Sequence, residues 1–315
     1  MLKSKKFVLG VIALSLIASA TTPVATAAPK NLARAVAQPD WLEKNLDNPK
    51  VRIIEVSTEP GVYERGHIQN SIKFVWHTDL VDVVNRDVIS KTEFTKLAQK
   101  AGIDADTTVV LYGDKNNWFA AWGAWIFNLY GQKDVRVLDG GRVKWEKDGR
   151  ALTTAVPTVK AGSFVAKSLD KTLRATLIRD VLPTAKKPSL AKLIDIRSAD
   201  EYNGKIFAPA GFQELAVRAG HIPGAANIPW GLNVNADGTF KTVAELKKLY
   251  DDKGIDGKDK IITYCRIGER SSLTWFVLSE ILGYDVKNYD GSWTEYGNSV
   301  GVPIVNNAGT IWGAS

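Results

Sequence analysis

An internal repeat constrains the fold of this chain more than any other feature of its sequence. Gly113 ends the segment KLAQKAGIDADTTVVLYG, and Cys265 ends the matching segment KLYDDKGIDGKDKIITYC, at an offset of 152. Upstream, a Gly-His-Ile turn at His67 matches another at His221, at an offset of 154. We therefore expect two copies of one folding unit. A chain of 315 residues is also long enough for two domains of ordinary size.

Each half of the chain alternates strand and helix patterns. An apolar strand is followed by the Gly-His-Ile turn, an amphipathic helix, a second β-branched strand, a loop, a buried helix and an Asp-Gly turn. This alternation is typical of an α/β fold built on a parallel sheet. We predict two α/β domains, each a parallel sheet flanked by helices on both faces.

A stretch rich in Lys, Thr, Ala and Pro separates the two halves, and it runs from about Ala151 to Pro188. We place the domain boundary there. The N-terminal domain is assigned to 28–155, the linker to 156–188 and the C-terminal domain to 189–315. Within the linker, residues 173–182 are expected to pack as a strand or a short helix.

The first residues carry the pattern of a secretory signal peptide. Lys3, Lys5 and Lys6 lie beside the apolar run FVLGVIALSLIA, and Ala25-Thr26-Ala27 supplies a cleavage site. A membrane anchor is the alternative, but the run is shorter than the roughly 20 residues that a spanning helix needs. We expect residues 1–27 to be removed on export, which would leave the mature protein in the periplasm or the medium and free of the membrane.

The charge and residue content of the chain exclude several function classes. The formal charge of +7 includes the three signal lysines and would fall to +4 in the mature chain. No Lys/Arg block resembles a nucleic-acid-binding arm, so we expect no nucleic acid and only a basic surface that favours anionic substrates. One Cys and three scattered His give no zinc-like spacing, and no calcium loop is present. We predict no metal and no cofactor.

Cys265 is the only cysteine of the chain, so it is either a buried apolar filler or a reactive group. It follows the β-rich strand IITY and precedes a helix pattern that opens at Ser271 and Ser272. In open α/β sheets, ligands bind beyond the carboxyl ends of the strands, which is where this loop would lie. The position favours a reactive thiol.

The loop from Cys265 to Arg270 suits the binding of an anion, because a helix N-terminus directs N–H groups and a positive dipole at it. This helix end, together with Arg266 and Arg270, would lower the pKa of the thiol and supply a thiolate. Either guanidinium matches the geometry of an oxyanion. Gly268 would permit the tight curve of the loop. The alternative is a solvated turn in which both arginines form surface salt bridges.

The loop Cys-Arg-Ile-Gly-Glu-Arg-Ser-Ser resembles the active-site loop of bacterial tandem-domain rhodaneses. The likeness covers nearly all of the chain beyond the signal peptide. Each further motif alone would be weak, but together they are specific. They are LIDIR at 193–197, AGHIPGA at 219–225, NIPW at 227–230 and NYDGSWTEY at 288–296.

The resemblance implies a sulfurtransferase in which Cys265 is the nucleophile and carries sulfur as a persulfide. The thiolate would take the outer sulfur of thiosulfate, a small anionic donor, release sulfite, and pass the sulfur to cyanide or another thiophilic acceptor. Arg270 would close the loop, and Arg266 would bind the oxyanion of the substrate. Backbone amides would stabilise the persulfide, and they belong to Arg266, Ile267, Gly268, Glu269 and Arg270.

The N-terminal half matches the inactive module that this family usually contains. Gly113 stands where the C-terminal half has Cys265, and Trp118 stands where it has Arg270. The first module therefore lacks both the nucleophile and the loop arginine.

Arg197 and Glu201 mark a departure from the family pattern. Vertebrate members place a substrate-binding arginine near the position that Glu201 occupies here. Arg197 is a candidate substitute in substrate binding, although we favour a structural role in which Arg197 pairs with Glu201 and holds the loop.

Two further polar positions have counterparts in both halves. His221 suggests a cysteine hydrolase pair with Cys265, but His67 lies in the same turn of the half without a cysteine. Both histidines are therefore expected to stabilise turns. Asp195, matched by Glu55, is expected to be a structural carboxylate that supports the site.

The mouth of the site is expected to include the Asp-Gly turns and one tryptophan. These residues are Asp139, Asp290 and Trp293.

Three other functions remain as alternatives. A 3-mercaptopyruvate sulfurtransferase shares the fold, but its loop carries small residues where this chain has Arg266 and Glu269. A Cys-Arg phosphatase or arsenate reductase needs a loop one residue longer than the stretch between Cys265 and Arg270. A sulfur carrier would load the same cysteine and release the sulfur only to a partner protein. In each case we expect a monomer.

Overall fold

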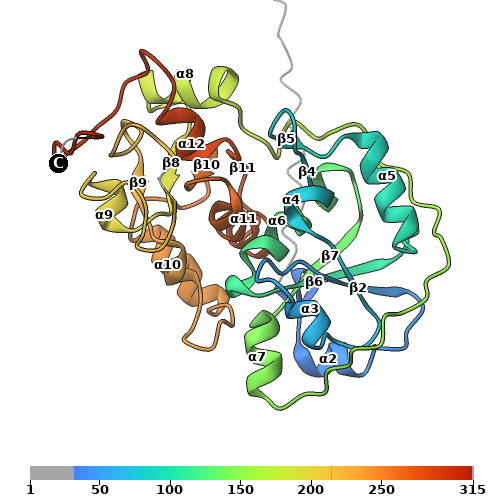
Figure 1. The fold of residues 1–315 in the computed structure, drawn as a ribbon. Helices are drawn as coiled ribbons and strands as arrows, with labels where there is room; N and C mark the ends of the chain where they lie inside the picture. The colour runs from blue at the N-terminus through green and yellow to red at the C-terminus, as the bar shows by residue number, and fades with distance from the viewer. Residues whose placement is uncertain (1–31, 214, 314–315) are drawn as a thin grey trace, which may run out of the picture.

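The computed structural model describes residues 32–213 and 215–313, which form two α/β modules side by side (Figure 1). The predicted signal peptide at 1–27 lies outside these residues. Each module is built on its own parallel sheet, which confirms the predicted fold class. Within the described residues, no helix is both long and apolar enough to span a bilayer.

The N-terminal sheet has five parallel strands in the order β1-β7-β6-β2-β3. β-Branched residues dominate β2 and β6, and successive side chains point to opposite faces. Ile54 and Leu111 face one core, whereas Ile53 and Val110 face the other. The strands are β1 (Val36–Ala37), β2 (Val51–Glu55), β3 (Ser71–Lys73), β6 (Thr108–Tyr112) and β7 (Asp134–Leu138).

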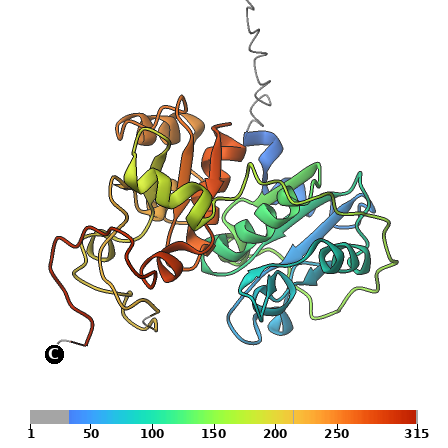
Figure 2. The ribbon, with the colours of Figure 1, turned by 90° about the horizontal axis from the view of Figure 1, so that it is seen from above.

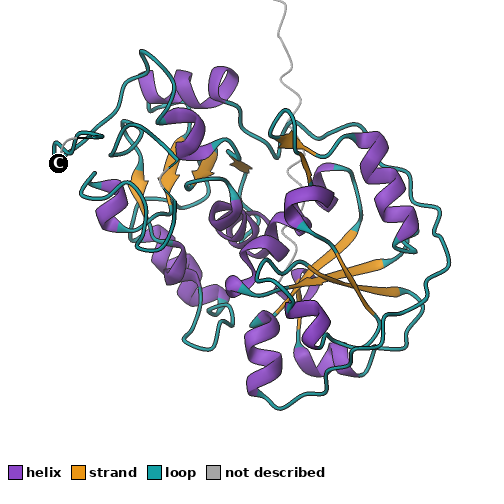
Figure 3. Ribbon diagram, in the orientation of Figure 1, coloured by secondary structure: helices purple, strands orange, loops and turns teal. Residues whose placement is uncertain are grey.

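Helices cover both faces of this sheet (Figure 3). α5 (Lys91–Lys100) and α6 (Trp118–Leu129) pack on one face, and α2 (Pro39–Glu43) and α7 (Gly141–Lys147) on the other. The shorter elements of the module are α3 (Val62–Arg65), α4 (Trp76–Asp79), a 3-10 turn at Lys115–Asn117, and a hairpin of β4 (Val81–Asp82) and β5 (Asp87–Val88).

The C-terminal sheet has four parallel strands in the order β11-β10-β8-β9. Ile194 and Ile261 face a core shared with α10 and α11, whereas Leu193 and Ile262 face a second core under α8 and α12. The strands are β8 (Lys192–Asp195), β9 (Ala226–Asn227), β10 (Ile261–Tyr264) and β11 (Val286–Asn288). The helices are α8 (Leu182–Lys186), α9 (Ala199–Tyr202), α10 (Val243–Asp251), α11 (Glu269–Phe276) and α12 (Ser292–Tyr296), with a 3-10 turn at Trp230–Asn233 and π-helical turns at Leu177–Val181 and Val277–Ile281.

The two modules meet through equivalent helices, because α6 packs against α11 at their boundary (Figures 1 and 2). One hydrophobic cluster runs across this boundary and includes Trp122 and Trp125 of α6 with Leu273 and Phe276 of α11. α1 (Leu32–Ala35) also packs at this junction, against β7 and the π-helical turn that follows α11. The loop that opens α11 therefore lies against the N-terminal module.

The residues assigned to the linker are folded against both modules. Phe164 packs on Phe94 of α5, with ring centroids 6.1 Å apart. Farther along, the Ala175 N–H donates to the Asn288 carbonyl at 3.0 Å, and Val181 and Ala185 are buried in the C-terminal core. The expected helix is present as the π-helical turn that leads into α8. The C-terminal core thus includes Val181 and Ala185, which fall within the linker assigned from the sequence.

Candidate active site

Cys265 lies at the carboxyl end of β10, in the loop that leads into α11, where the sequence predicted it. Its backbone N–H donates to the Ser292 hydroxyl at 3.1 Å, and the Gly268 N–H donates to its Sγ at 3.0 Å. The side chain is 0% exposed. The thiol is therefore held beneath the loop by a hydrogen bond from the loop itself.

Gly268 allows the loop to fit between the two modules. Its φ of +100° lies in the left-handed region, which favours glycine. A Cβ at this position would lie 2.6 Å from the ring of Trp122 and 2.8 Å from the backbone of Asp290. Any other residue would force the loop, Trp122 or the turn at Asp290 to shift.

Opposing groups act on the pKa of the thiol. Burial raises the pKa of Cys265 above its ordinary value, and the carboxylate of Glu269, with Oε2 at 3.5 Å from Sγ, raises it further. Arg270 and the N–H groups of Ser271 and Gly268 act in the other direction and do not outweigh burial. The prediction of a lowered pKa is therefore wrong for this conformation, because it neglected desolvation and Glu269. The protonated thiol donates to Glu269.

Arg270 forms a buried, bidentate ion pair with Glu201. Its two terminal nitrogens donate to the two carboxylate oxygens at 3.0 and 3.1 Å. Burial alone would raise the pKa of Glu201, but Arg270, Arg197 and the Ser198 N–H together outweigh it and hold that pKa below its ordinary value. The pair ties α9 to the start of α11. Arg270, rather than Arg197 as we expected, is thus the partner of Glu201.

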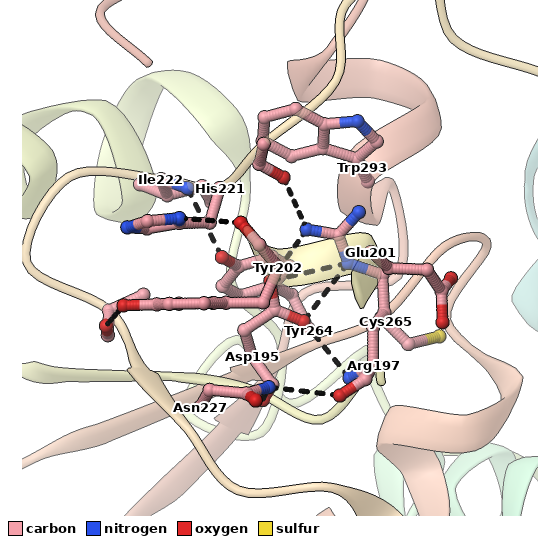
Figure 4. A network of polar contacts seen from close by, with 12 residues as sticks. Asp195, Arg197, Glu201, Tyr202, His221, Ile222, Asn227, Tyr264, Cys265 and Trp293 are labelled. Carbon is pink, nitrogen blue, oxygen red and sulfur yellow. Dashed lines mark hydrogen bonds and ion pairs between the residues drawn. The ribbon is translucent and has the colours of Figure 1, made fainter. Parts of the chain in front are cut away.

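Arg197 points into a buried network beneath the loop (Figure 4). Its guanidinium donates to Asp195 at 2.6 to 3.2 Å and to the Gly220 carbonyl at 2.7 Å, and it lies 4.7 Å from the ring centroid of Trp293. Arg197 is 1% exposed. These contacts favour a structural role for Arg197 in this conformation, because its hydrogen bonds point inward and it has almost no accessible surface. Asp195 is the structural carboxylate that we expected.

The two histidines make the same contacts in the two modules. His221 Nδ1 lies 2.7 Å from the Tyr202 carbonyl, and its ring stacks on Tyr202 at 3.6 Å. His67 Nδ1 lies 2.9 Å from the Tyr63 carbonyl, and its ring stacks on Tyr63 at 3.8 Å. Burial lowers the pKa of His221. The prediction that both histidines stabilise turns is confirmed.

A pocket of about 360 Å³ opens beside the loop, at the boundary between the modules. Trp118 of the N-terminal module and Trp230 of the C-terminal module meet edge to face at 4.8 Å. Arg266 donates to the Gln213 carbonyl at 2.6 Å, and its guanidinium lies 5.3 Å from the ring centroid of Phe212. Aromatic and proline side chains thus form most of the wall. The lining residues are Trp118, Ser198, Glu201, Pro209, Phe212, Pro229, Trp230, Gly231, Arg266, Glu269 and Arg270.

The three residues that we expected at the mouth of the site lie outside this lining. Trp293 packs on Arg197 and donates to the Arg218 carbonyl at 2.8 Å. Asp290 accepts two hydrogen bonds from Arg174 at 2.8 Å. Asp139 accepts the Phe240 N–H at 2.9 Å. The three residues therefore do not line this pocket, and Trp293 supports the site from below, because its backbone N–H donates to the Cys265 carbonyl at 3.0 Å.

Ser292 is the site residue that the sequence reasoning missed. Its hydroxyl accepts the Cys265 N–H and lies 4.0 Å from Sγ. Its φ of +51° is unusual for a residue other than glycine. Comparison of the two repeats could have pointed to Ser292, because the N-terminal copy has Gly141 at the equivalent place in its Asp-Gly turn. The hydroxyl occurs only in the half that has the thiol.

The equivalent loop of the N-terminal module is filled by its own side chains. The Gly113 N–H donates to Asn117 Oδ1 at 3.0 Å. That amide oxygen lies 2.3 Å from where a Cβ at Gly141 would stand, so it takes the place of the Ser292 side chain. A Cβ at Gly113 would lie 2.3 Å from the carbonyl oxygen of Val56. This loop has no room for a cysteine.

No group of three or more His, Cys, Asp or Glu side chains is placed to hold a metal ion in the part of the chain that the structure describes. The groups that surround Sγ are backbone N–H donors, the Ser292 hydroxyl, Arg270 and Glu269. Such a set can orient a thiol and stabilise negative charge on sulfur.

Sequence comparison relates the chain to known proteins. The family described as Rhodanese-like domain matches residues 38–148 and 181–299. A Mycolicibacterium smegmatis protein named "Putative thiosulfate sulfurtransferase" is 51% identical over 267 residues, which cover 84% of this chain and 95% of that protein. The sulfur carrier protein TtuD of Thermus thermophilus is 52% identical over 269 residues, which cover 84% of this chain and 94% of that protein.

Structure comparison agrees with these matches. The 3-mercaptopyruvate sulfotransferase SseA from Escherichia coli matches with a TM-score of 0.69 at 26% identity, and the match covers 82% of this chain and 98% of that one. The two segments of the family match fall on the two modules, and the relatives are aligned over most of both chains. The chain therefore belongs to the rhodanese family, as a tandem-domain sulfurtransferase.

Proposed function

We propose that this sulfurtransferase moves the outer sulfur of thiosulfate to a thiophilic acceptor through a persulfide on Cys265. The observation that carries the proposal is the hydrogen bond from the Gly268 N–H to Sγ, at the start of a buried helix with Arg270 beside it. This arrangement stabilises negative charge on sulfur, which both the attacking thiolate and the persulfide need. The name of the mycobacterial relative supports thiosulfate as the donor.

The reaction has two displacements at sulfur. In the first, the Cys265 thiolate attacks the outer sulfur of thiosulfate, a new S–S bond forms, and the S–S bond of thiosulfate breaks as sulfite leaves with the electron pair. In the second, an acceptor such as cyanide attacks the terminal sulfur of the persulfide, and the thiolate leaves. No oxidant is needed, because the sulfur moves as a neutral atom between two nucleophiles.

The first proton transfer has a candidate acceptor in the loop. The thiol donates to Glu269 Oε2 at 3.5 Å, and Glu269 lines the pocket whereas Cys265 does not. Glu269 therefore takes the thiol proton and moves aside when the donor enters. The movement exposes the sulfur, which is fully buried in this conformation.

The remaining loop residues bind and orient the donor. Arg266 and Arg270 line the charged end of the pocket, where a sulfonate-like group would lie. The Gly268 N–H donates to Sγ and the Ser271 N–H also acts on the thiol, so these two backbone donors at the N-terminus of α11 support negative charge on sulfur. Arg270 acts while paired with Glu201, so its position is fixed before the donor arrives.

A sulfur carrier is the second candidate, because the Thermus thermophilus relative is named as one. Such a protein would form the same persulfide and release the sulfur only to a partner protein. Loading without turnover on cyanide or small thiols would favour it. The 3-mercaptopyruvate reaction remains a weaker alternative, because Arg266 and Glu269 line the pocket next to the thiol.

The test is the intact mass of the protein after incubation with thiosulfate, compared with a Cys265→Ser variant. We expect the wild-type chain to gain one sulfur atom and to lose it on addition of cyanide, with release of thiocyanate. A wild-type protein that gains no sulfur from thiosulfate would overturn the proposal. Phosphatase activity on an aryl phosphate without loading would favour the Cys-Arg phosphatase alternative.

We also propose that the protein is exported and loses residues 1–27. The support is the sequence pattern of Lys3, Lys5 and Lys6 before an apolar run and the Ala25-Thr26-Ala27 site. N-terminal sequencing of the protein recovered from the periplasm or medium should begin after Ala27. An intact N-terminus in the cytoplasmic fraction would contradict export.

A further inference from the structure

The β4–β5 hairpin of the N-terminal module reaches the active loop of the C-terminal module. Arg86, at the tip of this hairpin, donates from Nη2 to the carbonyl oxygen of Ile267 at 2.7 Å. Ile267 lies two residues after Cys265 in the loop that surrounds the thiol. A side chain of the module without a nucleophile therefore contacts the backbone of the module that has one.

The contact falls on a peptide group whose other end donates to the sulfur. The carbonyl of Ile267 and the N–H of Gly268 belong to the same peptide bond, which is planar with its C=O and N–H pointing in opposite directions. Arg86 binds the oxygen, and the N–H donates to Cys265 Sγ at 3.0 Å. The guanidinium thus fixes the plane in which the N–H points at the sulfur.

We propose that Arg86 is a positioning residue for sulfur transfer, which acts on Cys265 through the Ile267–Gly268 peptide. The inference rests on the proposed persulfide function. It gives the N-terminal module a direct part in the chemistry, because that module supplies the cation that holds and polarises an N–H donor of the persulfide. Hydrogen bonds in a chain strengthen one another, so a cation on the oxygen makes the N–H a better donor.

The hairpin is built to present Arg86 at this place. The backbone of Arg86 has a φ of +56°, a left-handed conformation that costs energy for a residue with a side chain. Asp82 closes the turn by accepting the N–H groups of Val84 and Asn85 at 2.9 Å each. The Arg86 guanidinium also lies 6.0 Å from the ring centroid of Trp122.

The next residue of the hairpin makes a second connection to the loop. Asp87 pairs with Arg174 at 2.6 Å, and Arg174 pairs with Asp290 at 2.8 Å. Asp290 precedes the turn in which Ser292 accepts the Cys265 N–H. Two consecutive residues of the hairpin therefore support the two sides of the thiol site.

A change at Arg86 should be measurable beside the two charged side chains that act on the thiol. Glu269 raises the pKa of the thiol and Arg270 lowers it, both from α11. Arg86 adds a positive charge from the N-terminal module, transmitted by one peptide group. Without it the Gly268 N–H is a weaker and less fixed donor, so the thiolate is less stable.

The experiment uses the full chain with Arg86→Ala, Arg86→Lys and a matched control, Arg65→Ala. Arg65 is an exposed arginine of the same module that donates to the Pro60 carbonyl at 3.1 Å, away from the loop. The rate of sulfur loading from thiosulfate is followed by intact mass. The pH midpoint of the thiolate is followed by its ultraviolet absorbance, with Cys265→Ser as the blank.

We expect Arg86→Ala to load sulfur roughly tenfold more slowly, as for loss of a donor that acts on the reacting charge. Its thiolate midpoint should move to higher pH, Arg86→Lys should recover part of both effects, and Arg65→Ala should match the wild type. Wild-type loading and an unchanged midpoint in Arg86→Ala would overturn the inference. So would slow loading with an unchanged midpoint, because that pattern marks a purely structural role.

The thiolate midpoint separates the inference from the proposed function. If the wild type fails to load sulfur, the proposed donor is wrong, yet the midpoints of the three arginine variants still report whether Arg86 acts on Cys265. If the wild type loads sulfur, and the midpoint moves in Arg86→Ala, moves less in Arg86→Lys and stays unchanged in Arg65→Ala, both hold.

Discussion

Below their loops, the two modules use the same polar contacts with different residues. In the C-terminal module, Arg197 connects the carboxylate of Asp195 to the carbonyl of Gly220. In the N-terminal module, Arg142 connects the carboxylate of Glu55 to the carbonyl of Gly66, at 3.1 and 2.6 Å. Arg197 follows the strand, whereas Arg142 comes from the start of α7. An arginine thus links the strand-end carboxylate to a glycine carbonyl in both modules, although the two arginines come from different positions in the repeat.

The tyrosines at the ends of the matching strands also agree. The Tyr264 hydroxyl accepts the Ile222 N–H at 3.2 Å, and the Tyr112 hydroxyl accepts the Ile68 N–H at 2.9 Å. This network therefore belongs to the fold and cannot by itself make a module active. The modules differ in the loop above the network, so the proposed reactivity of the C-terminal module is assigned to Cys265 and its immediate neighbours.

The largest losses of stability and of sulfur loading should come from breaking the two buried arginine–glutamate ion pairs, one in each module. Arg270→Gln and Arg142→Gln each leave a buried carboxylate without its partner, Glu201 or Glu55, and should lower the free energy of unfolding by about 3–5 kcal/mol. Only Arg270→Gln should also reduce sulfur loading, by roughly 100-fold or more, because it removes the cation beside the thiol. Denaturant unfolding and loading rates measure the two effects. Equal loss of loading in Arg142→Gln would break the comparison.

The next largest effect on sulfur loading should come from the Ser292 hydroxyl, which the N-terminal copy lacks. Ser292→Ala leaves the Cys265 N–H without its acceptor, so loading should slow by about tenfold. Gly141→Ser introduces the serine at the equivalent place of the N-terminal module. It should destabilise that module, because its Cβ would lie 2.3 Å from Asn117 Oδ1. Sulfur loading should be unchanged. Loading kinetics and thermal unfolding of both variants provide the measurement. Normal loading by Ser292→Ala would show that the hydroxyl has no role.

The pH dependence of sulfur loading should depend on Glu269. Burial makes the largest contribution to the raised pKa of the Cys265 thiol, and the charge of Glu269 makes the second. Glu269→Gln removes that charge, so the pH midpoint for sulfur loading should move to lower pH. The sign for stability follows from the raised pKa in the folded state. The stability that the protonated thiol contributes is fully present below the thiol pKa of the unfolded chain, about 8.5. It is lost as the pH rises through the thiol pKa of the folded protein. Glu269→Gln should weaken this loss above pH of about 8.5, and an unmoved loading midpoint would contradict the assignment.

The smallest effect should come from the aromatic wall that the N-terminal module gives to the pocket. Trp118 stands at the position that matches Arg270, yet it lines the pocket of the other module against Trp230. Trp118→Ala should weaken donor or acceptor binding by about 3-fold to 10-fold in KM, with little change in kcat, because the wall only positions the substrate. Trp118→Phe should retain most of the binding. A large fall in kcat would mean that Trp118 affects the loop.

The position of the loop around the proposed nucleophile could be predicted from the sequence because its residues are neighbours in the chain. The positions of Cys265, Gly268 and Arg270 follow from one strand, one turn and one helix start. The partner of Arg270 could not be assigned correctly, because Glu201 lies 69 residues away and Arg197 carried the same charge. The contact from Arg86 spans 181 residues and two modules, so no local pattern contains it.

The raised pKa of the thiol was also beyond local reasoning. The sequence shows the arginines and the helix start, which lower a thiol pKa, but burial depends on how α6 packs over the loop. Trp122 lies close enough to Gly268 that a Cβ would meet it at 2.6 Å. Desolvation is thus a property of the assembled modules.

The most direct test is to measure whether a cysteine accepts sulfur after β10, at position 265, or after β6, at position 113. Wild type, Cys265→Ser, and Cys265→Ser combined with Gly113→Cys would be incubated with thiosulfate and analysed by intact mass and peptide mapping. We predict one added sulfur on Cys265 in the wild type and none in either variant, because the loop after β6 has no room for a thiol at Gly113. Sulfur on the cysteine introduced by Gly113→Cys, or none on the wild type, would contradict the claim that the loop around Cys265 makes this sulfurtransferase.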